Sequence, residues 1–422
     1  MSYLPRFLKF SGYETTDIQE NHTDGIITIH LKRNDSKSFD CHKCGTALVR
    51  RRGQHRLKLQ HMPIFDFAVF IKVWRVKGDC PKCKKARSEE MDLVAKETPH
   101  MTKDFSWWLG KLCEFSPVSR AADFYETGKM SAWRADFKRM KIMLKYYKIP
   151  KVNAISVDEV YARRTGPKGE SRNKRFFTVI TDLKTRKVIW VSESRDKVAL
   201  DQFFEIIGEK ACKKIKVVSM DQHESYRISV KQYCKNAKVV WDRFHLMQNF
   251  NEAVNDERKK IFQYASPGSR GLYQGKYRFI FVKKDSKRTE SEKQHIKDAM
   301  EGNHLYLQLE LIKERFHTFF DAASVEEAQY IFDEVGEWIN QSCFFELQRW
   351  WENLEKEWDT LSNYFEFRVT TAVSEGINNV IKTLKRRAYG YRNMEYFRLK
   401  IMQLCGYLNS QFIPNINYLY EV

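Results

Sequence analysis

The sequence has no long apolar run and no recognisable export signal. Its most apolar stretch, Phe67 to Trp74, is interrupted by Lys72 and falls far short of the roughly 18 residues that cross a bilayer. The stretch from Met1 to Phe10 lacks the apolar core of a signal peptide. We therefore expect a cytoplasmic protein that has no membrane partner.

Cysteine is scarce and unevenly placed. The nine cysteines are an odd, scattered set, which excludes the paired framework of a secreted disulfide protein and indicates a reducing compartment. Internal repeats and low-complexity linkers are also absent. Hydrophobic residues make up 42% of the 422 positions, so the chain can fill packed cores, and its length suits about two to four domains.

Acidic residues are in deficit. Lys and Arg number 74 against 54 Asp and Glu, which gives a net charge of +20. Such a balance favours a polyanionic partner, of which nucleic acid is the most common. A merely basic surface is the alternative.

Four cysteines form two C-x-x-C pairs, Cys41 with Cys44 and Cys80 with Cys83. Each pair lets two thiolates reach one ion from a tight turn, and two pairs complete the tetrahedral Cys₄ site that zinc prefers. The pattern favours one structural Zn²⁺, with unliganded core cysteines as the alternative. Between the pairs, Arg50, Arg51 and Arg52 lie in an acid-free stretch and either contact DNA or form a solvated face.

A helix-turn-helix is predicted between residues 117 and 144. Pro117 opens the first helix, Gly128 lies in the turn, and Ser131 is the expected N-cap of a helix from Ala132 to about Leu144. A plain helical hairpin is the alternative. The second helix carries the basic residues expected to contact DNA, namely Arg134, Lys138, Arg139 and Lys141.

Residues 151 to 262 alternate between strand and helix. The order β-β-β-α-β-α-β is that of an RNase H-like mixed sheet, and most of the chain beyond it is predicted to be helical, so we expect an α+β multidomain protein. The predicted elements are strands at Val152–Val157, Arg175–Thr181 and Lys187–Val191, a helix at Lys197–Ile207, and strands at Ile215–Met220 and Val239–Trp241.

Two carboxylates, Asp158 and Asp221, end strands that this order makes neighbours. They would meet at one sheet edge and bind divalent cations, which can activate a nucleophile and stabilise a leaving oxygen. Glu375 is the expected third ligand. It begins a helix on whose exposed side Lys382 and Arg386 would follow a DNA backbone. A surface carboxylate is the alternative for any one acid alone.

The helix that begins near Glu375 is expected to be amphipathic. Glu366 is a rival to Glu375, but the alternating Phe365 and Phe367 indicate an extended segment there, and Glu395 follows Gly390, where the helix is expected to have ended. The residues expected on the buried face are Val373, Ile377, Val380, Ile381, Leu384 and Ala388.

Several strings resemble those of bacterial insertion-sequence DDE transposases of the ISL3 type. The resemblance extends from Cys41 to about Ile401, and its C-terminal string is the most specific. The strings are Ser156-Val157-Asp158-Glu159, Met220-Asp221 followed by Tyr226, Trp241-Asp242-Arg243-Phe244-His245, Ser374-Glu375-Gly376-Ile377-Asn378-Asn379-Val380-Ile381-Lys382, and Lys385-Arg386-Arg387-Ala388-Tyr389-Gly390-Tyr391-Arg392-Asn393.

The resemblance implies an enzyme that binds the terminal inverted repeats of its own element, as a homodimer on DNA at the nucleoid. It would nick DNA with water and join the freed 3′-hydroxyl to target DNA, using two Mg²⁺ per active site. The matching triad is Asp158, Asp221 and Glu375. His245, in an Asp-x-x-His string, would lie near the scissile phosphate, with a packed histidine as the alternative. The basic residues expected along the DNA are Lys382, Lys385, Arg386, Arg387 and Arg392.

We therefore expect a zinc-binding domain at 1–95, a helix-turn-helix domain at 96–150, an RNase H-like catalytic domain at 151–262 and 366–410, and a helical insertion at 263–365. A non-catalytic DNA-binding regulator and a metal-dependent nuclease without strand transfer remain as alternatives. The insertion carries four tryptophans that are expected in its core rather than wedged into DNA, namely Trp338, Trp350, Trp351 and Trp358.

Overall fold

The computed structural model describes residues 10–34, 38–163, 170–264, 271, 277–369, 372–409 and 411. The chain divides into two compact units, one formed mainly by the residues up to Tyr147 and one running from Lys148 to Gly406. Each unit contains one mixed sheet together with helices, which confirms the predicted α+β class. None of the helices in the described ranges is both long and apolar enough to cross a membrane.

The first unit is built on a seven-stranded sheet of order β1-β2-β4-β3-β7-β6, with β5 paired to β4. Alternating apolar residues such as Ile29, Leu59 and Ile71 point to one face and form its core. The β-rich character predicted for this region is confirmed. The strands are β1 (Tyr13–Asn21), β2 (Ile26–Arg33), β3 (Arg50–Ile64), β4 (Phe67–Cys80), β5 (Lys85–Ser88), β6 (Val94–Ala95) and β7 (Thr98–Thr102).

Three helices complete this unit: α1 (Lys103–Leu112), α2 (Val118–Phe124) and α3 (Lys129–Tyr146). Pro117 caps α2 as expected, but α3 begins three residues early with Gly128 as its N-cap, so Ser131 is buried in the first turn and is not the cap. Helices α1 and α3 pack closely at Gly110, where an added Cβ would lie 3.0 Å from the carbonyl oxygen of Ala135.

Arg139 of α3 is buried in this helical packing, with only 1% of its surface exposed. Its guanidinium forms an ion pair with the buried Glu114 and lies 4.8 Å from the ring centre of Trp107. The prediction that Arg139 contacts DNA is therefore wrong. A helical pattern shows that a residue faces one side, but it does not show that another helix covers that side.

The second unit contains a five-stranded sheet of order β10-β9-β8-β11-β12. The first three strands pair antiparallel, and β8, β11 and β12 pair parallel. The predicted sequence of strands and helices is present. Its elements are β8 (Ala154–Tyr161), β9 (Phe176–Asp182), β10 (Lys187–Ser192), α4 (Lys197–Ile207), α5 (Glu209–Cys212), β11 (Val217–Met220), α6 (Glu224–Tyr233) and β12 (Lys238–Trp241).

Helices cover both faces of this sheet. Neighbouring residues of β9 show the alternation: Phe177 contacts Phe397 of α15 (Met394–Leu404), whereas the hydroxyl of Thr178 lies 2.8 Å from that of Tyr226 on α6. Helix α14 (Ala372–Arg387) lies against β8 on the α15 side. Val380 is 50% exposed and Ala388 is exposed, contrary to prediction, because only a narrow stripe of α14 meets the sheet.

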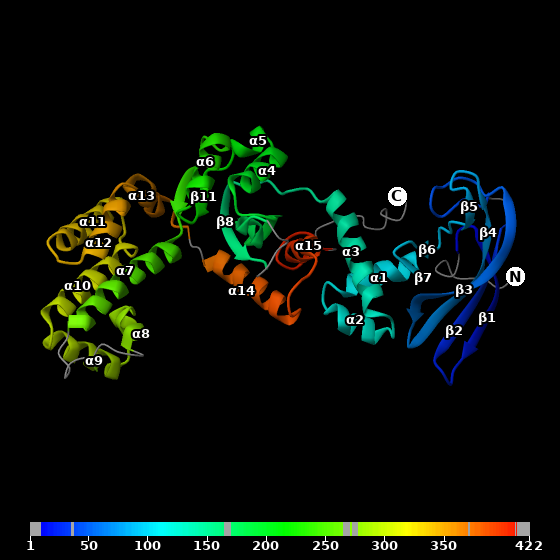
Figure 1. The fold of residues 1–422 in the computed structure, drawn as a ribbon, viewed down its shortest axis with the longest axis horizontal. Coiled ribbons are helices and arrows are strands. Elements are labelled where there is room, and N and C mark those ends of the chain that lie inside the picture. The colour runs from blue at the N-terminus through cyan, green and yellow to red at the C-terminus, as the bar shows by residue number, and fades with distance from the viewer. Residues whose placement is uncertain are drawn as a thin grey trace. The chain divides into compact units, whose positions relative to one another are not determined.

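A helical bundle joins β12 to α14 (Figure 1). Its first helix starts at Arg243, directly after β12, whereas we expected the helical insertion to start at residue 263. Trp351 is buried in the core of the bundle, as predicted. Glu366 lies within α13, so the extended segment predicted there is wrong. The bundle contains α7 (Arg243–Tyr264), α8 (Tyr277–Phe281), α9 (Glu290–Glu301), α10 (His304–Phe319), α11 (Val325–Asn340), α12 (Phe345–Glu355) and α13 (Trp358–Phe367).

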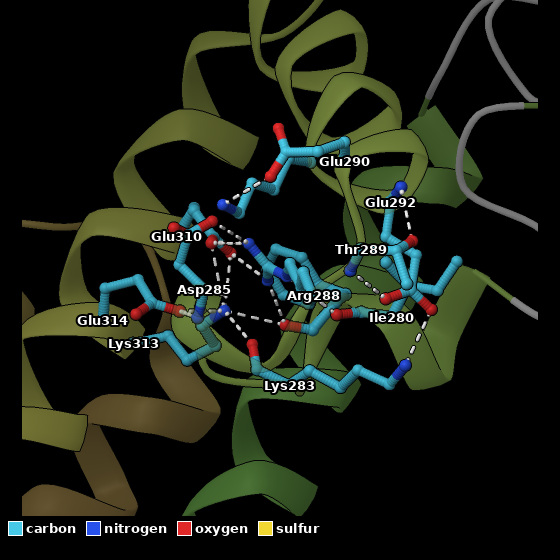
Figure 2. A network of polar contacts seen from close by, with 12 residues as sticks. Ile280, Lys283, Asp285, Arg288, Thr289, Glu290, Glu292, Glu310, Lys313 and Glu314 are labelled. Atoms are coloured by element: carbon cyan, nitrogen blue, oxygen red, sulfur yellow. Dashed lines mark hydrogen bonds and ion pairs between the residues drawn. The ribbon is translucent and has the colours of Figure 1, made fainter.

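A buried polar network fastens α8 to α10 in this bundle (Figure 2). Lys313 is fully buried and donates to the carbonyl oxygens of Phe281 and Lys283 at 2.8 and 2.9 Å, while Arg288 forms an ion pair with Glu310. Burial lowers the pKa of Lys313, and the adjacent Glu310 opposes that shift. The donors satisfy carbonyl oxygens that the end of a helix leaves free.

Candidate functional site

Three aspartates lie where the parallel pairing of three adjacent strands ends. Met220 is the last residue of β11 to pair in parallel with both β8 and β12. The next residue on each strand is an aspartate: Asp158, Asp221 and Asp242. Because parallel strands keep a common level along the sheet, the three carboxylates lie at one edge. Asp158 is inside β8 and not at its end as predicted, since β8 continues in its antiparallel pairing with β9.

The Asp158 carboxylate is partly buried and hydrogen-bonded through both oxygens. The backbone N–H of Glu159 donates to Oδ1 at 2.6 Å, and the Asn378 side-chain amide donates to Oδ2 at 2.8 Å. Burial raises the pKa of Asp158, and these hydrogen bonds partly oppose that shift. The carboxylate is thus held in one orientation while its charge is destabilised.

Asp221 has an oxygen that is suited to a cation. Its Oδ1 is buried without a hydrogen bond, and the Nε2 of His245 lies 3.3 Å from it. The pKa of Asp221 is raised to about 7, chiefly by burial; His245 opposes the rise, and the nearby carboxylates of Asp158 and Asp242 add to it. A divalent cation would supply a partner for Oδ1 of Asp221 and would reduce the repulsion between the carboxylates.

Asp242 joins this site although we did not predict it as a ligand. Single ligand atoms of Asp221, Asp242 and His245 lie within 4.8 Å of one another, close enough to hold one ion. Oδ1 of Asp242 accepts from the backbone N–H of Phe244 at 2.7 Å, and Oδ2 faces His245 at 3.9 Å. Its position one residue after a predicted strand, as for Asp221, was the signal that could have identified it.

Glu375 lies beside this site without touching it. Helix α14 is held to β8 by a contact of 2.6 Å between the hydroxyls of Ser374 and Ser156 and by the Asn378 contact with Asp158. Glu375 is exposed and makes no hydrogen bond or ion pair within the described ranges. It precedes Asn378 by three residues, so the two side chains are neighbours on the helix surface.

The four paired cysteines form a second potential metal site, in the first unit. One sulfur from each of Cys41, Cys44, Cys80 and Cys83 lies within 4.8 Å of the others, and all four are free thiols. Hydrogen bonds from Thr46 lower the pKa of Cys44, which favours the thiolate that binds metal. This arrangement fits a tetrahedral zinc ion.

Most of the basic residues predicted to contact DNA are on the surface. Arg134 is exposed on α3, and Lys138 next to it pairs with Glu97 at 2.5 Å. Lys385 differs, because its ammonium donates to the carbonyl oxygen of Tyr161 at 3.0 Å and so helps to seat α14. The other exposed residues of the predicted set are Arg50, Arg51, Arg52, Lys141, Lys382, Arg386, Arg387 and Arg392.

Carboxylates gathered at a sheet edge in a protein of net charge +20 are typical of enzymes that act on nucleic acid with divalent cations. A family model described as "Transposase", that of the ISL3-type DDE transposases, matches residues 155–401, more than half of the chain. The chain therefore belongs to this family. Membership implies that the protein acts on DNA and uses divalent metal.

Similar proteins are also transposases. The chain is 24% identical over 397 residues to the transposase of insertion sequence element IS1001 from Bordetella parapertussis, which covers 93% of this chain and 95% of that protein. It is 27% identical over 111 residues to the transposase of insertion sequence element IS1557 from Mycobacterium tuberculosis, which covers 26% of this chain and 23% of that protein.

The raised pKa of Asp221 predicts a pH-dependent loss of stability without metal. Folding favours the neutral form, because the folded pKa is about 7 against an ordinary value of 3.8. The contribution of Asp221 to stability should therefore fall as the pH rises from about 4 through 7. Asp221→Asn stays neutral, so its stability advantage over the wild type should be larger at pH 8 than at pH 5. Urea unfolding of chelator-treated protein measures this, and an equal advantage at both pH values would contradict it.

Proposed function

We propose that this transposase cuts DNA at the terminal inverted repeats of an insertion sequence and joins the freed 3′ ends to target DNA. The observation that carries the proposal is that Asp158 and Asp221 lie at one level on the adjacent strands β8 and β11, with one oxygen of Asp221 buried and without a hydrogen bond. Helix α14 brings Glu375 to the same side of the sheet. A non-catalytic regulator would have no use for such a carboxylate cluster.

In this proposal, Asp158, Asp221 and Glu375 are the catalytic metal ligands. Two Mg²⁺ held there would activate the attacking oxygen and stabilise the leaving oxygen. His245, whose Nε2 lies 3.3 Å from Asp221, would orient that carboxylate and face the scissile phosphate. The strand order is β10-β9-β8-β11-β12, in which β10, β9 and β8 pair antiparallel and β11 and β12 continue the sheet in parallel with β8. This order supports an RNase H-like domain. Asp242 is a further acid for the same site.

We assign DNA binding to several surfaces. The α2–α3 pair acts as a helix-turn-helix that reads the element ends through Arg134 and Lys138, while the exposed side of α14 follows the backbone through Lys382 and Arg386. The proposed domains remain the zinc module, the helix-turn-helix, the split catalytic domain and the helical insertion. Because two ends must be cut and joined together, the active species is a homodimer on DNA, at the bacterial nucleoid.

Glu375→Gln should lose cleavage and joining by several orders of magnitude, because it removes a metal ligand. Its affinity for the element ends should stay near normal, since other parts of the chain supply most of the binding. Gel assays of end cleavage, strand transfer and end binding measure the three properties. Glu366→Gln, which changes an exposed acid in α13, is the matched control.

Two outcomes of that experiment would redirect the proposal. Robust Mg²⁺-dependent cleavage by Glu375→Gln would show that the third ligand is another carboxylate. Cleavage by the wild-type protein without any joining to target DNA would favour a nuclease over a transposase.

Arg134 and Arg139 should behave differently although they lie on one helix. Arg134→Ala should reduce the preference for element ends over random DNA, because its exposed side chain can reach base edges. Arg139→Ala should instead cost about 3–5 kcal/mol of unfolding free energy, because it removes the guanidinium that forms an ion pair with the buried Glu114. Competition binding and urea unfolding distinguish them. An equal loss of specific and random binding in Arg134→Ala would exclude base reading by that residue.

The cysteine cluster should hold about one structural zinc per chain. Cys80→Ser removes a ligand and should lower the zinc content while it destabilises the sheet of the first unit. The catalytic unit should remain folded, since it has its own core. Elemental analysis with limited proteolysis tests this, and a folded first unit that contains no zinc would refute it.

A further inference from the structure

The contact between Asn378 and Asp158 joins parts of the protein that are distant in the chain. The other donor to Asp158, the backbone N–H of Glu159, belongs to the same strand and moves with it. The Asn378 amide comes from α14, 220 residues later, and reaches Oδ2 at 2.8 Å. It is the side-chain contact through which α14 determines the orientation of this carboxylate.

Helix α14 runs along β8 through three polar contacts that keep the same order in both elements. The first joins the hydroxyls of Ser374 and Ser156 at 2.6 Å, and the last joins the ammonium of Lys385 to the carbonyl oxygen of Tyr161 at 3.0 Å. Asn378 lies between them, about one turn after the first. A slide or rotation of the helix by one residue would break all three contacts.

The same register places Glu375. Ile377 and Ile381 face the sheet and are buried, whereas Glu375 lies on the exposed flank next to Asn378. Side chains three residues apart on a helix are neighbours. The Asn378 contact therefore fixes where Glu375 can reach relative to Asp158.

We propose that Asn378 is a positioning residue that holds Asp158 and α14 in register, so that Asp158 and Glu375 bind the same cation. This inference rests on the proposed function. A carboxylate has about four lone-pair sites, so the two hydrogen bonds to Asp158 leave a free site on each oxygen for a cation. Residues that orient metal ligands in this way typically change metal affinity or activity by about 10–100-fold when they are replaced.

The test compares Asn378→Leu with Asn379→Leu. Leucine has the same number and branching of side-chain heavy atoms as asparagine but cannot donate, so it removes the hydrogen bond without opening a cavity. Asn379 is the adjacent exposed residue, and it makes no hydrogen bond in the described part of the chain. Mn²⁺ binding is measured by electron paramagnetic resonance on protein bound to pre-cleaved end DNA, so that no turnover is involved.

Asn378→Leu should bind Mn²⁺ about 10–100-fold more weakly and need correspondingly more metal for cleavage. Asn379→Leu should bind Mn²⁺ as tightly as the wild type. Asn378→Leu should keep the wild-type affinity for element ends and the wild-type thermal midpoint. Equal Mn²⁺ affinities for the two leucine variants would overturn the proposal, because a residue that only fills space would be replaced by leucine without effect on metal.

A second variant decides the question if Asn378→Leu melts early. Asn378→Gln keeps the amide on a longer side chain, so its Mn²⁺ affinity should recover toward that of the wild type. A loss as large as that of the leucine variant, in a protein with a wild-type thermal midpoint, would overturn the positioning role.

Asp158→Asn separates this inference from the proposed function. It should lose both the carboxylate-bound Mn²⁺ and cleavage. If Asp158→Asn binds Mn²⁺ and cleaves like the wild type, the proposed catalytic site is wrong. If Asp158→Asn loses both properties while Asn378→Leu keeps both, only the role of Asn378 is wrong.

Discussion

The parallel alignment of β8, β11 and β12 is the constraint on which the rest of the second unit depends. It brings Asp158, Asp221 and Asp242 to one level, where burial and nearby carboxylates raise the pKa of Asp158 and of Asp221. Such a group of acids is costly in a folded protein unless a cation or a strong donor compensates it. The contacts from Asn378, Glu159 and His245 supply part of that compensation and leave positions for metal.

The helical bundle lies between Asp242 and Glu375 in the chain and does not interrupt the sheet. It has its own aromatic core around Trp351, and its last helix returns to the sheet, where the amide of Asn363 donates to the carbonyl oxygen of Val239 at 2.9 Å. The ion pair between Arg227 of α6 and Glu357 makes a second connection at 3.0 Å. Because the bundle begins and ends beside β12, the chain can return to β8, where α14 contacts Asp158 through Asn378.

Local pattern was enough to predict the order of strands and helices along residues 151–262, the cysteine cluster and the exposed position of Glu375. It failed where the outcome depends on which element packs on which. Arg139 is on a basic helical face, yet α1 covers it; Val380 fits an apolar stripe, yet only part of that stripe reaches the sheet. Asn378 could not be chosen over Asn379 from the sequence, because only the register of α14 on β8 decides which amide meets Asp158.

The distribution of charge explains why binding and chemistry are assigned to different parts of the chain. A net charge of +20 attracts DNA, but the aspartate cluster repels the phosphate that must enter it. Basic residues near the acids would relieve the repulsion but would also compete with metal for the carboxylates. Most of the exposed cations that we propose to contact DNA lie on β3, α3 and the outer side of α14, while the acids have hydrogen-bond donors and a histidine as close partners. A metal cation bound among the aspartates would then attract both the carboxylates and the DNA phosphate.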